Sequence, residues 1–280
     1  MTTLGGLTLN VLEAGAGREH TLLLIHGFLD CAWTWEPLLE HGLGARFHVL
    51  APDLRGHGDS DRVGAGGYYH FFDYLPDLAA VVEQLAPGRL SVVGHSMGGT
   101  LAGYFAGLWP ERVSRLVLLE GLGPPEDPTA LPDRVRGWVD GWQRRLAAPP
   151  KRYPSVAAAE ERMMAFDPLL DAARARRLAE LSTRRLADGQ FEFKHDPLHL
   201  TRGPHAFRVE AAAELWARVT CPVLYVEGAE SSYRAMGDEL ERRLAHFSHI
   251  ERQLLPAAGH MMQRHAPAEL AELITRHVGE

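Results

Sequence analysis

Leu90-Ser91-Val92-Val93-Gly94-His95-Ser96-Met97-Gly98-Gly99 is the most informative stretch of the chain: an apolar, β-branched run ends in Gly-x-Ser-x-Gly and continues into residues with helical spacing. Glycine on both sides of the serine lets the backbone turn sharply between a strand and a helix. Such a turn exposes Ser96 at the end of a strand, as a nucleophile requires. The motif also occurs in ordinary glycine-containing loops, but the flanking patterns favour a nucleophile.

The composition indicates one α/β domain with an insertion. The chain has 280 residues, 46% of them hydrophobic, which is enough for a large core. Its formal net charge of -7 argues against nucleic acid as a partner, because a phosphate-binding face needs a clustered basic excess. Cys31 and Cys221 are far apart and lack metal-ligand spacing, so we interpret both as reduced thiols and expect no metal site.

The beginning of the chain carries no targeting pattern. Residues 1–6 have neither a basic region nor an apolar one, and no run approaches the ~18 apolar residues of a membrane span. We therefore expect a cytoplasmic protein that does not bind a membrane.

Strand-like runs alternate with helical patterns along most of the chain. The runs are Leu7 to Glu13, Thr21 to Ile25, Phe47 to Ala51, Leu90 to Val93, Val113 to Leu119, Pro222 to Val226 and Ile250 to Leu255. This alternation predicts a mostly parallel sheet with helices on both faces, in which ligands bind at the carboxyl ends of the strands.

The alternation breaks between Gly121 and Leu215, where a proline-rich stretch leads into helical, arginine-rich sequence with few strand signals. We interpret residues 123–212 as a helical cap inserted into a core formed by residues 1–122 and 213–280. Arginines such as the pair Arg144-Arg145 are typical of a solvated helix face, although they could also face an acidic substrate. The candidate pocket residues are Trp33, Trp138, Trp142, Met163, Phe166 and Met261, for which packing within the core or cap is the alternative.

Four motifs in this order resemble those of the α/β-hydrolase superfamily, specifically its cap-bearing, serine-esterase-like branch. They are His26-Gly27-Phe28, Asp53-Leu54-Arg55-Gly56-His57-Gly58-Asp59-Ser60, Gly94-His95-Ser96-Met97-Gly98-Gly99 and Ala258-Gly259-His260. The resemblance covers nearly the whole chain. It implies an α/β-hydrolase fold and catalytic residues in the order serine, acid, histidine.

A serine nucleophile also needs a base and oxyanion donors. His260 follows a strand-like run and a short loop, so this loop can carry its imidazole back to Ser96 as the general base. By resemblance, the oxyanion donors are the backbone N–H groups of Phe28 and Met97. We interpret Asp53 and Arg55 as a structural ion pair.

The acid departs from the commonest pattern of this superfamily. After the strand that follows the cap, Ser231 stands where the resemblance places an aspartate, and Glu230 lies beside it. Glu120 directly follows the buried run Leu116 to Leu119, where a carboxylate is costly to desolvate unless it has a partner such as an imidazole. We predict Glu120 as the acid, with Glu230 as the rival and Ser231 as a possible support for the same imidazole.

These residues predict a serine hydrolase without metal or cofactor, most simply a carboxylesterase that cleaves small to medium apolar esters through an acyl-enzyme. The same triad also serves thioesterases, lactonases and C–C bond hydrolases, so these alternatives stay open. A ligand-sensing module that does not turn substrate over is the alternative from another class. The expected partner is a small-molecule ester, and the expected assembly is a monomer or homodimer.

Overall fold

The computed structural model describes residues 1–3 and 5–279 and contains a seven-stranded sheet in the order β1-β3-β2-β4-β5-β8-β9. The strands are β1 (Val11–Ala14), β2 (His20–Ile25), β3 (His48–Pro52), β4 (Arg89–His95), β5 (Val113–Leu119), β8 (Val223–Gly228) and β9 (Ile250–Leu255). Only the β1–β3 pairing in this sheet is antiparallel. The predicted mostly parallel sheet is confirmed, although its first strand begins at Val11 rather than at Leu7.

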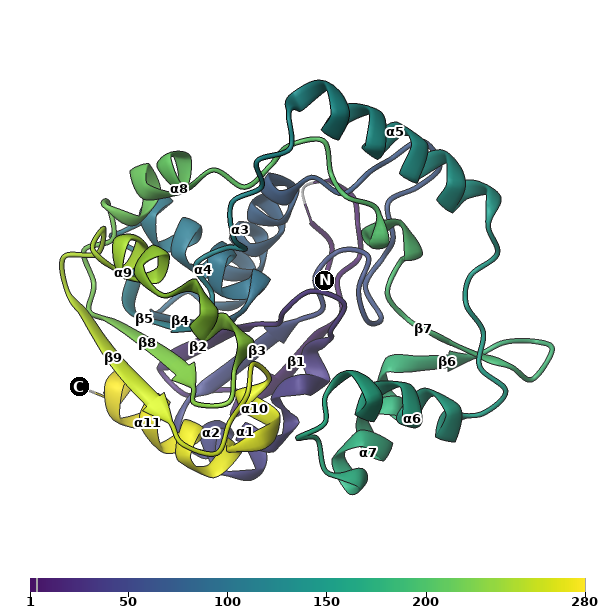
Figure 1. The fold of residues 1–280 in the computed structure, drawn as a ribbon. Helices are drawn as coiled ribbons and strands as arrows, with labels where there is room; N and C mark the ends of the chain where they lie inside the picture. Colours follow the sequence, from purple (N-terminus) through teal and green to yellow (C-terminus); the bar gives the residue numbers. More distant parts are fainter. Residues whose placement is uncertain (4, 280) are drawn as a thin grey trace.

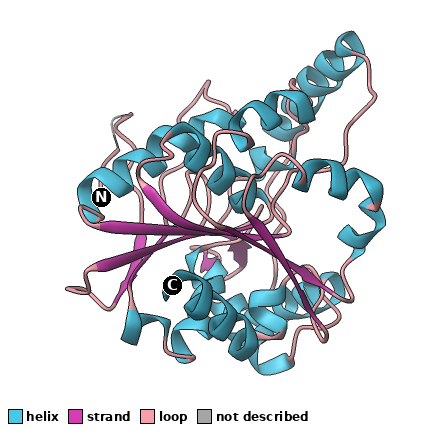
Figure 2. Cartoon of the chain, turned by 90° about the vertical axis from the view of Figure 1, so that its left-hand side faces the viewer, coloured by secondary structure: helices cyan, strands magenta, loops and turns pink. Residues whose placement is uncertain are grey.

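Helices cover both faces of this sheet (Figures 1 and 2). One face packs against α3 (Tyr74–Leu85), α4 (Met97–Leu108), α8 (Val209–Trp216) and α9 (Asp238–Leu244). The other packs against η1 (Ala32–Trp35), α1 (Glu36–Glu40), α2 (Leu43–Arg46), α10 (Met262–His265) and α11 (Pro267–Gly279). Alternate residues of β2 point to the two layers: Leu23 and Ile25 join the first core, and Leu22 and Leu24 join the second. Short 3-10 turns also form at η2 (Phe71–Asp73) and η4 (Ser232–Met236).

The segment predicted as a helical cap contains more than helices. It holds α5 (Leu131–Ala147), α6 (Val156–Phe166), α7 (Ala172–Ser182), η3 (Pro197–Leu200) and a two-stranded antiparallel sheet of β6 (Thr183–Arg185) and β7 (Phe191–Phe193). The hairpin turns at Gly189, whose φ of +84° suits glycine. The predicted boundary at residue 212 falls inside α8. This helix belongs with the core of the sheet, since Ala212 and Trp216 both pack in the first core. In Figure 1, α5 and the α6–α7 pair extend to one side of the sheet.

The loop after β3 is braced differently from the prediction, because Asp53 and Arg55 do not pair with each other. The buried Asp53 carboxylate accepts one hydrogen bond from the backbone N–H of Ala32 at 2.6 Å. It accepts another from the side-chain amide of Asn10 at 2.8 Å. Arg55 instead forms an ion pair with Asp77 of α3 at 2.6 Å. A carboxylate surrounded by N–H donors needs no cation, which leaves Arg55 free to reach the next helix.

Neither cysteine forms a disulfide, and both are buried. Burial raises the pKa of Cys221 to about 11 and that of Cys31 further still, so both are protonated thiols at neutral pH. Within the described part of the chain, no cluster of three or more His, Cys, Asp or Glu side chains could hold a metal ion. No helix there has both the length and the apolar character needed to span a bilayer.

Candidate active site

The turn that carries Ser96 joins β4 to α4 at the carboxyl edge of the sheet. Ser96 has φ +54° and ψ -118°, a strained conformation for a residue with a side chain. The flanking glycines allow the backbone segments to touch: a Cβ on Gly94 would lie 2.2 Å from Gly98 O, and one on Gly98 would lie 2.2 Å from Ile25 O. The Ser96 N–H donates to Leu119 O at 2.9 Å. These contacts hold the Ser96 side chain at the N-terminus of α4.

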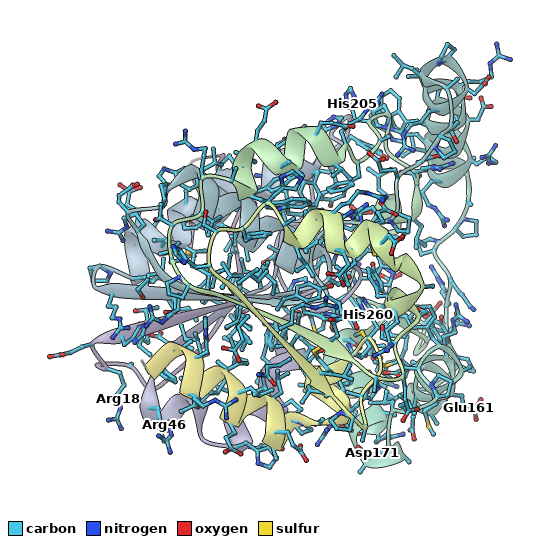
Figure 3. The ribbon with its side chains drawn as sticks, turned by 60° about the vertical axis from the view of Figure 1, so that its left-hand side comes forward. Arg18, Arg46, Glu161, Asp171, His205 and His260 are labelled. Carbon is cyan, nitrogen blue, oxygen red and sulfur yellow. The ribbon has the colours of Figure 1, made fainter. Side chains whose placement is uncertain are left out.

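His260 lies on the loop after β9 and reaches Ser96. Its Nε2 is 3.0 Å from Ser96 Oγ, and its Nδ1 is 2.7 Å from Glu120 Oε2. A carboxylate only accepts, so Nδ1 carries the proton and Nε2 accepts from the serine hydroxyl. The end of β4 helps to fix this loop, because His95 Nε2 donates a hydrogen bond to His260 O at 2.8 Å. Figure 3 shows His260 at the edge of the sheet opposite Arg18 and Arg46.

Glu120 is the carboxylate that the fold brings to His260. It follows β5 with φ +46° and is 1% exposed. Besides the imidazole, its carboxylate accepts from Gly228 N at 2.9 Å and from Ser231 Oγ at 2.6 Å. Three donors from two segments, the end of β8 with the turn after it and the loop after β9, therefore satisfy one buried carboxylate and fix its orientation.

Glu230, the predicted rival, is exposed and does not reach the imidazole. Its backbone N–H donates to Ala258 O at 2.9 Å, but its carboxylate has no hydrogen bond or ion pair with any residue that the structure describes. Ser231 lies in the support position: its hydroxyl donates to Glu120 and accepts from Tyr233 N at 3.2 Å.

Tyr233 belongs to the site although the sequence did not single it out. Its ring stacks on His260 with centroids 4.4 Å apart and planes 5° apart. Burial raises the pKa of its hydroxyl, and the contact of this hydroxyl with Ser96 partly offsets that rise. Its place depends on the approach of two loops, and the only sequence signal is its position two residues after Ser231.

We expect Tyr233→Phe to lower kcat/KM for an ester by about two- to tenfold, because it removes one hydroxyl contact and keeps the stacked ring. Tyr233→Ala should lower it further and should also lower Tm, since the aromatic pair with His260 is lost. Steady-state kinetics and thermal unfolding of both variants test this. Equal activity in the alanine variant and the wild type would show that the ring does not position His260.

The two predicted oxyanion donors belong to segments that lie close to Ser96. Met97 begins α4, and Phe28 follows β2 and lines the same cavity as Ser96. Neither backbone N–H donates to an acceptor within residues 1–3 and 5–279. The N-terminus of α4 also favours negative charge at this point. The arrangement is chemically suited to bind the oxyanion of a tetrahedral intermediate.

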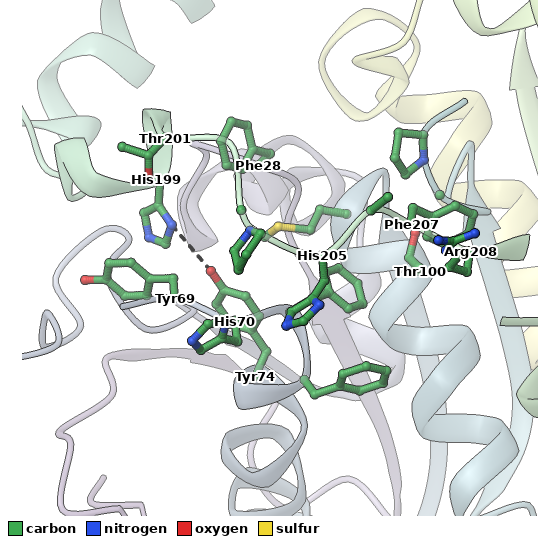
Figure 4. A pocket seen from close by; sticks show the side chains of 18 of the residues that line it. Phe28, Tyr69, His70, Tyr74, Thr100, His199, Thr201, His205, Phe207 and Arg208 are labelled. Atoms are coloured by element: carbon green, nitrogen blue, oxygen red, sulfur yellow. Dashed lines mark hydrogen bonds between the residues drawn. The ribbon is translucent and has the colours of Figure 1, made fainter. Parts of the chain in front are cut away.

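A cavity of about 850 Å³ opens beside Ser96. Nine aromatic side chains are among its lining residues: Phe28, Tyr68, Tyr69, Phe71, Phe72, Tyr74, Tyr104, Phe207 and Tyr233. Figure 4 shows Tyr69, Tyr74 and His199 on one side of the cavity and Phe207 and Arg208 on the other. Such a lining favours a bulky apolar ligand.

The predicted pocket residues do not line this cavity. Met163, Phe166 and Met261 line a second, smaller cavity instead. Trp138 and Trp142 of α5 pack behind the larger cavity against the ring of Tyr68, with centroids 5.4 and 4.9 Å apart. Trp33 lies under the guanidinium of Arg177. The prediction does not hold for the cavity beside Ser96, because three of these side chains line the other cavity and the remaining three pack on Tyr68 or Arg177.

His199 attaches the inserted segment to the core beside this cavity. Its ring lies between those of Tyr69 and His57, with centroids 3.9 and 4.1 Å away, and its Nδ1 is 3.5 Å from Tyr74 Oη (Figure 4). Burial lowers the pKa of His199 to about 4, against a smaller opposing effect of Asp196. Burial also lowers the pKa of His57 well below its usual value. Both rings are therefore neutral at pH 7.

Acidification should destabilise the protein through His199. The folded state resists protonation until about pH 4, whereas the unfolded chain takes up the proton near 6.5. The stabilisation is present above the unfolded pKa and is lost as the pH falls toward 4. The free energy of unfolding of the wild type should therefore fall between pH 7 and pH 4.5. In His199→Phe this fall should be smaller by about 2–3 kcal/mol. Urea unfolding at both pH values measures this, and parallel losses in the two proteins would contradict it.

Comparison with known proteins agrees with the fold. The family model described as alpha/beta hydrolase fold matches residues 20–266. An esterase from Mycobacterium tuberculosis is 30% identical over 266 residues, or 92% of this chain and 82% of the esterase. A serine hydrolase-like protein from Danio rerio is 34% identical over 65% of this chain, which spans only 56% of that relative. The solved thioesterase domain from the curacin biosynthetic pathway superimposes with a TM-score of 0.84 at 25% sequence identity. The match covers 97% of this chain and 96% of the thioesterase domain.

Proposed function

The chain belongs to the alpha/beta hydrolase fold family, and we propose that it is a serine hydrolase that cleaves carboxylic esters through an acyl-enzyme intermediate. The observation that carries the proposal is the hydrogen-bonded series Ser96, His260 and Glu120, with separations of 3.0 and 2.7 Å, at the wall of an aromatic cavity. The esterase from Mycobacterium tuberculosis supports the same activity class.

In the proposed reaction, His260 Nε2 removes the proton of Ser96 as its Oγ attacks the ester carbonyl. Glu120 holds the imidazole in the reactive tautomer and stabilises its protonated form. The N–H groups of Phe28 and Met97 stabilise the oxyanion, and the imidazolium then protonates the departing alcohol. Water, activated by the same imidazole, releases the acid and restores Ser96.

We also propose that the inserted segment serves as a cap that selects the substrate. Leu198, His199, Thr201 and Phe207 of this segment line the cavity beside Ser96. The aromatic lining favours an ester with an apolar acyl or alcohol group.

A fluorophosphonate probe tests the proposal, because it labels only an activated serine. We expect labelling of the wild type, none of Ser96→Ala, and hydrolysis in a screen of esters with varied acyl and alcohol chains. An unlabelled, inactive wild type would instead favour a ligand-sensing module.

A thioesterase is the second candidate, because the curacin thioesterase domain superimposes on almost the whole chain. Matched oxoesters and thioesters with the same acyl chain distinguish the two. A kcat/KM at least tenfold higher for the thioester would favour the thioesterase.

A further inference from the structure

A second cavity, of about 330 Å³, lies between the core and the inserted segment. Phe28 lines both this cavity and the larger one that contains Ser96. Met261, which directly follows His260, lines it as well. The smaller cavity therefore begins at residues that adjoin the reactive groups, and the proposed reaction does not use it.

Each carboxylate that lines the smaller cavity lies beside a basic side chain. Asp30 pairs with Arg264 at 2.7 Å, Glu192 pairs with Arg184 at 2.5 Å, and Asp167 is 2.9 Å from His265 Nε2. Arginines therefore balance the charges of Asp30 and Glu192. His195 also lines the cavity, but burial lowers the pKa of its imidazole to about 4, so it is neutral at pH 7.

Three cations that line the same cavity have no carboxylate partner among the described residues. They are Arg145 of α5, Lys151 in the loop after α5, and Arg162 of α6. Arg145 Nε is buried and has no hydrogen-bond partner. Lys151 Nζ lies 5.2 Å from the centroid of the Tyr153 ring. Unpaired cations in a concave site attract an anion, and a buried guanidinium N–H costs free energy until an acceptor binds it.

Apolar side chains surround these cations. Phe28, Phe166 and Leu200 line the cavity and are 49%, 78% and 49% exposed. Large exposed apolar groups gathered at a cavity are typical of a binding site. Together with the three cations, they favour a ligand that has an apolar body and an anionic end.

We propose that the smaller cavity binds an oxyanion, a carboxylate or a phosphate, at the end of an apolar chain. Arg145 and Arg162 hold the oxyanion through charge-assisted hydrogen bonds, which guanidinium groups form in paired geometry. If the function proposed above holds, on which this further step rests, the oxyanion is one end of the substrate, whose chain passes Phe28 to reach Ser96. The protein would then prefer esters with an anionic end over neutral esters of equal length.

Calorimetric titration with octanoate, octyl phosphate and 1-octanol tests the site without any hydrolysis. The wild type should bind at least one of the anions about ten- to a hundredfold more tightly than the alcohol, as expected for hydrogen bonds to charged groups. The double variant Arg145→Gln with Arg162→Gln should lose this preference. Arg144→Gln is the matched control, because Arg144 is exposed on the same helix and lines neither cavity.

Equal affinities for the anions and the alcohol, or an unchanged preference in the double variant, would overturn the proposal. Arg162→Gln alone, at an exposed position, should reduce the preference partly and replaces the double variant if that one does not fold. The ranking of octanoate against octyl phosphate identifies which oxyanion the cavity takes. Failure of Ser96 to react with the fluorophosphonate would refute the proposed function but would leave this binding result unaffected.

Discussion

Ser96→Ala is expected to lower kcat/KM for esters by at least ~10³-fold, because no other group at the site can form the acyl-enzyme. His260, Glu120 and the oxyanion N–H groups remain in this variant, so any residual hydrolysis comes from direct attack of water on the ester carbonyl. The fold should be unaffected, because among the residues that the structure describes the Ser96 hydroxyl contacts only His260 and Tyr233. Steady-state hydrolysis of a p-nitrophenyl ester, with Tm as the check on folding, measures the effect.

Cys221→Ser is the control for this prediction. The buried Cys221 thiol is protonated at neutral pH and lies outside both cavities, so its replacement should leave activity within about twofold. If Ser96→Ala keeps more than a tenth of the wild-type rate, Ser96 is not the nucleophile.

The sheet could be predicted from the sequence because its inner strands are buried on both faces. Such strands read as short continuous apolar runs, and those ending at Ile25, Leu119 and Val226 match β2, β5 and β8 closely. The strand-turn-helix at Ser96 is also a local property, since glycines at fixed positions allow it. The sequence pattern predicts the structure correctly where an element depends on contacts between residues near in sequence, or on burial that repeats along a strand.

The lining of the cavity could not be predicted, because it depends on contacts between distant segments. The aromatic character of Trp138 and Trp142 indicates burial, but it does not say that Tyr68 covers them on the cavity side. The three-residue strands β6 and β7 are too short for a clear periodic signal. Tyr233 reaches His260 only because η4 and the loop after β9 meet above Ser96.

Glu120→Gln is expected to lower kcat by ~10²- to 10⁴-fold with little change in fold, as loss of the orienting acid does in other triads. The size follows from the donors around this side chain. Gly228 N, Ser231 Oγ and His260 Nδ1 all donate to the carboxylate. A glutamine has one acceptor oxygen and an amide that donates, so one donor loses its acceptor and the charge that stabilises the imidazolium disappears.

The neighbouring variants separate this role from a general effect of charge. Glu230→Gln removes an exposed carboxylate without a described partner, so its kcat should stay within about twofold of the wild type. Ser231→Ala removes one hydrogen bond to Glu120 and one from Tyr233 N, and should lower kcat by about three- to tenfold. Steady-state kinetics on the three purified variants rank them. A large loss in Glu230→Gln together with a nearly silent Glu120→Gln would place the acid after β8 instead of after β5, in contradiction to the 2.7 Å contact with His260.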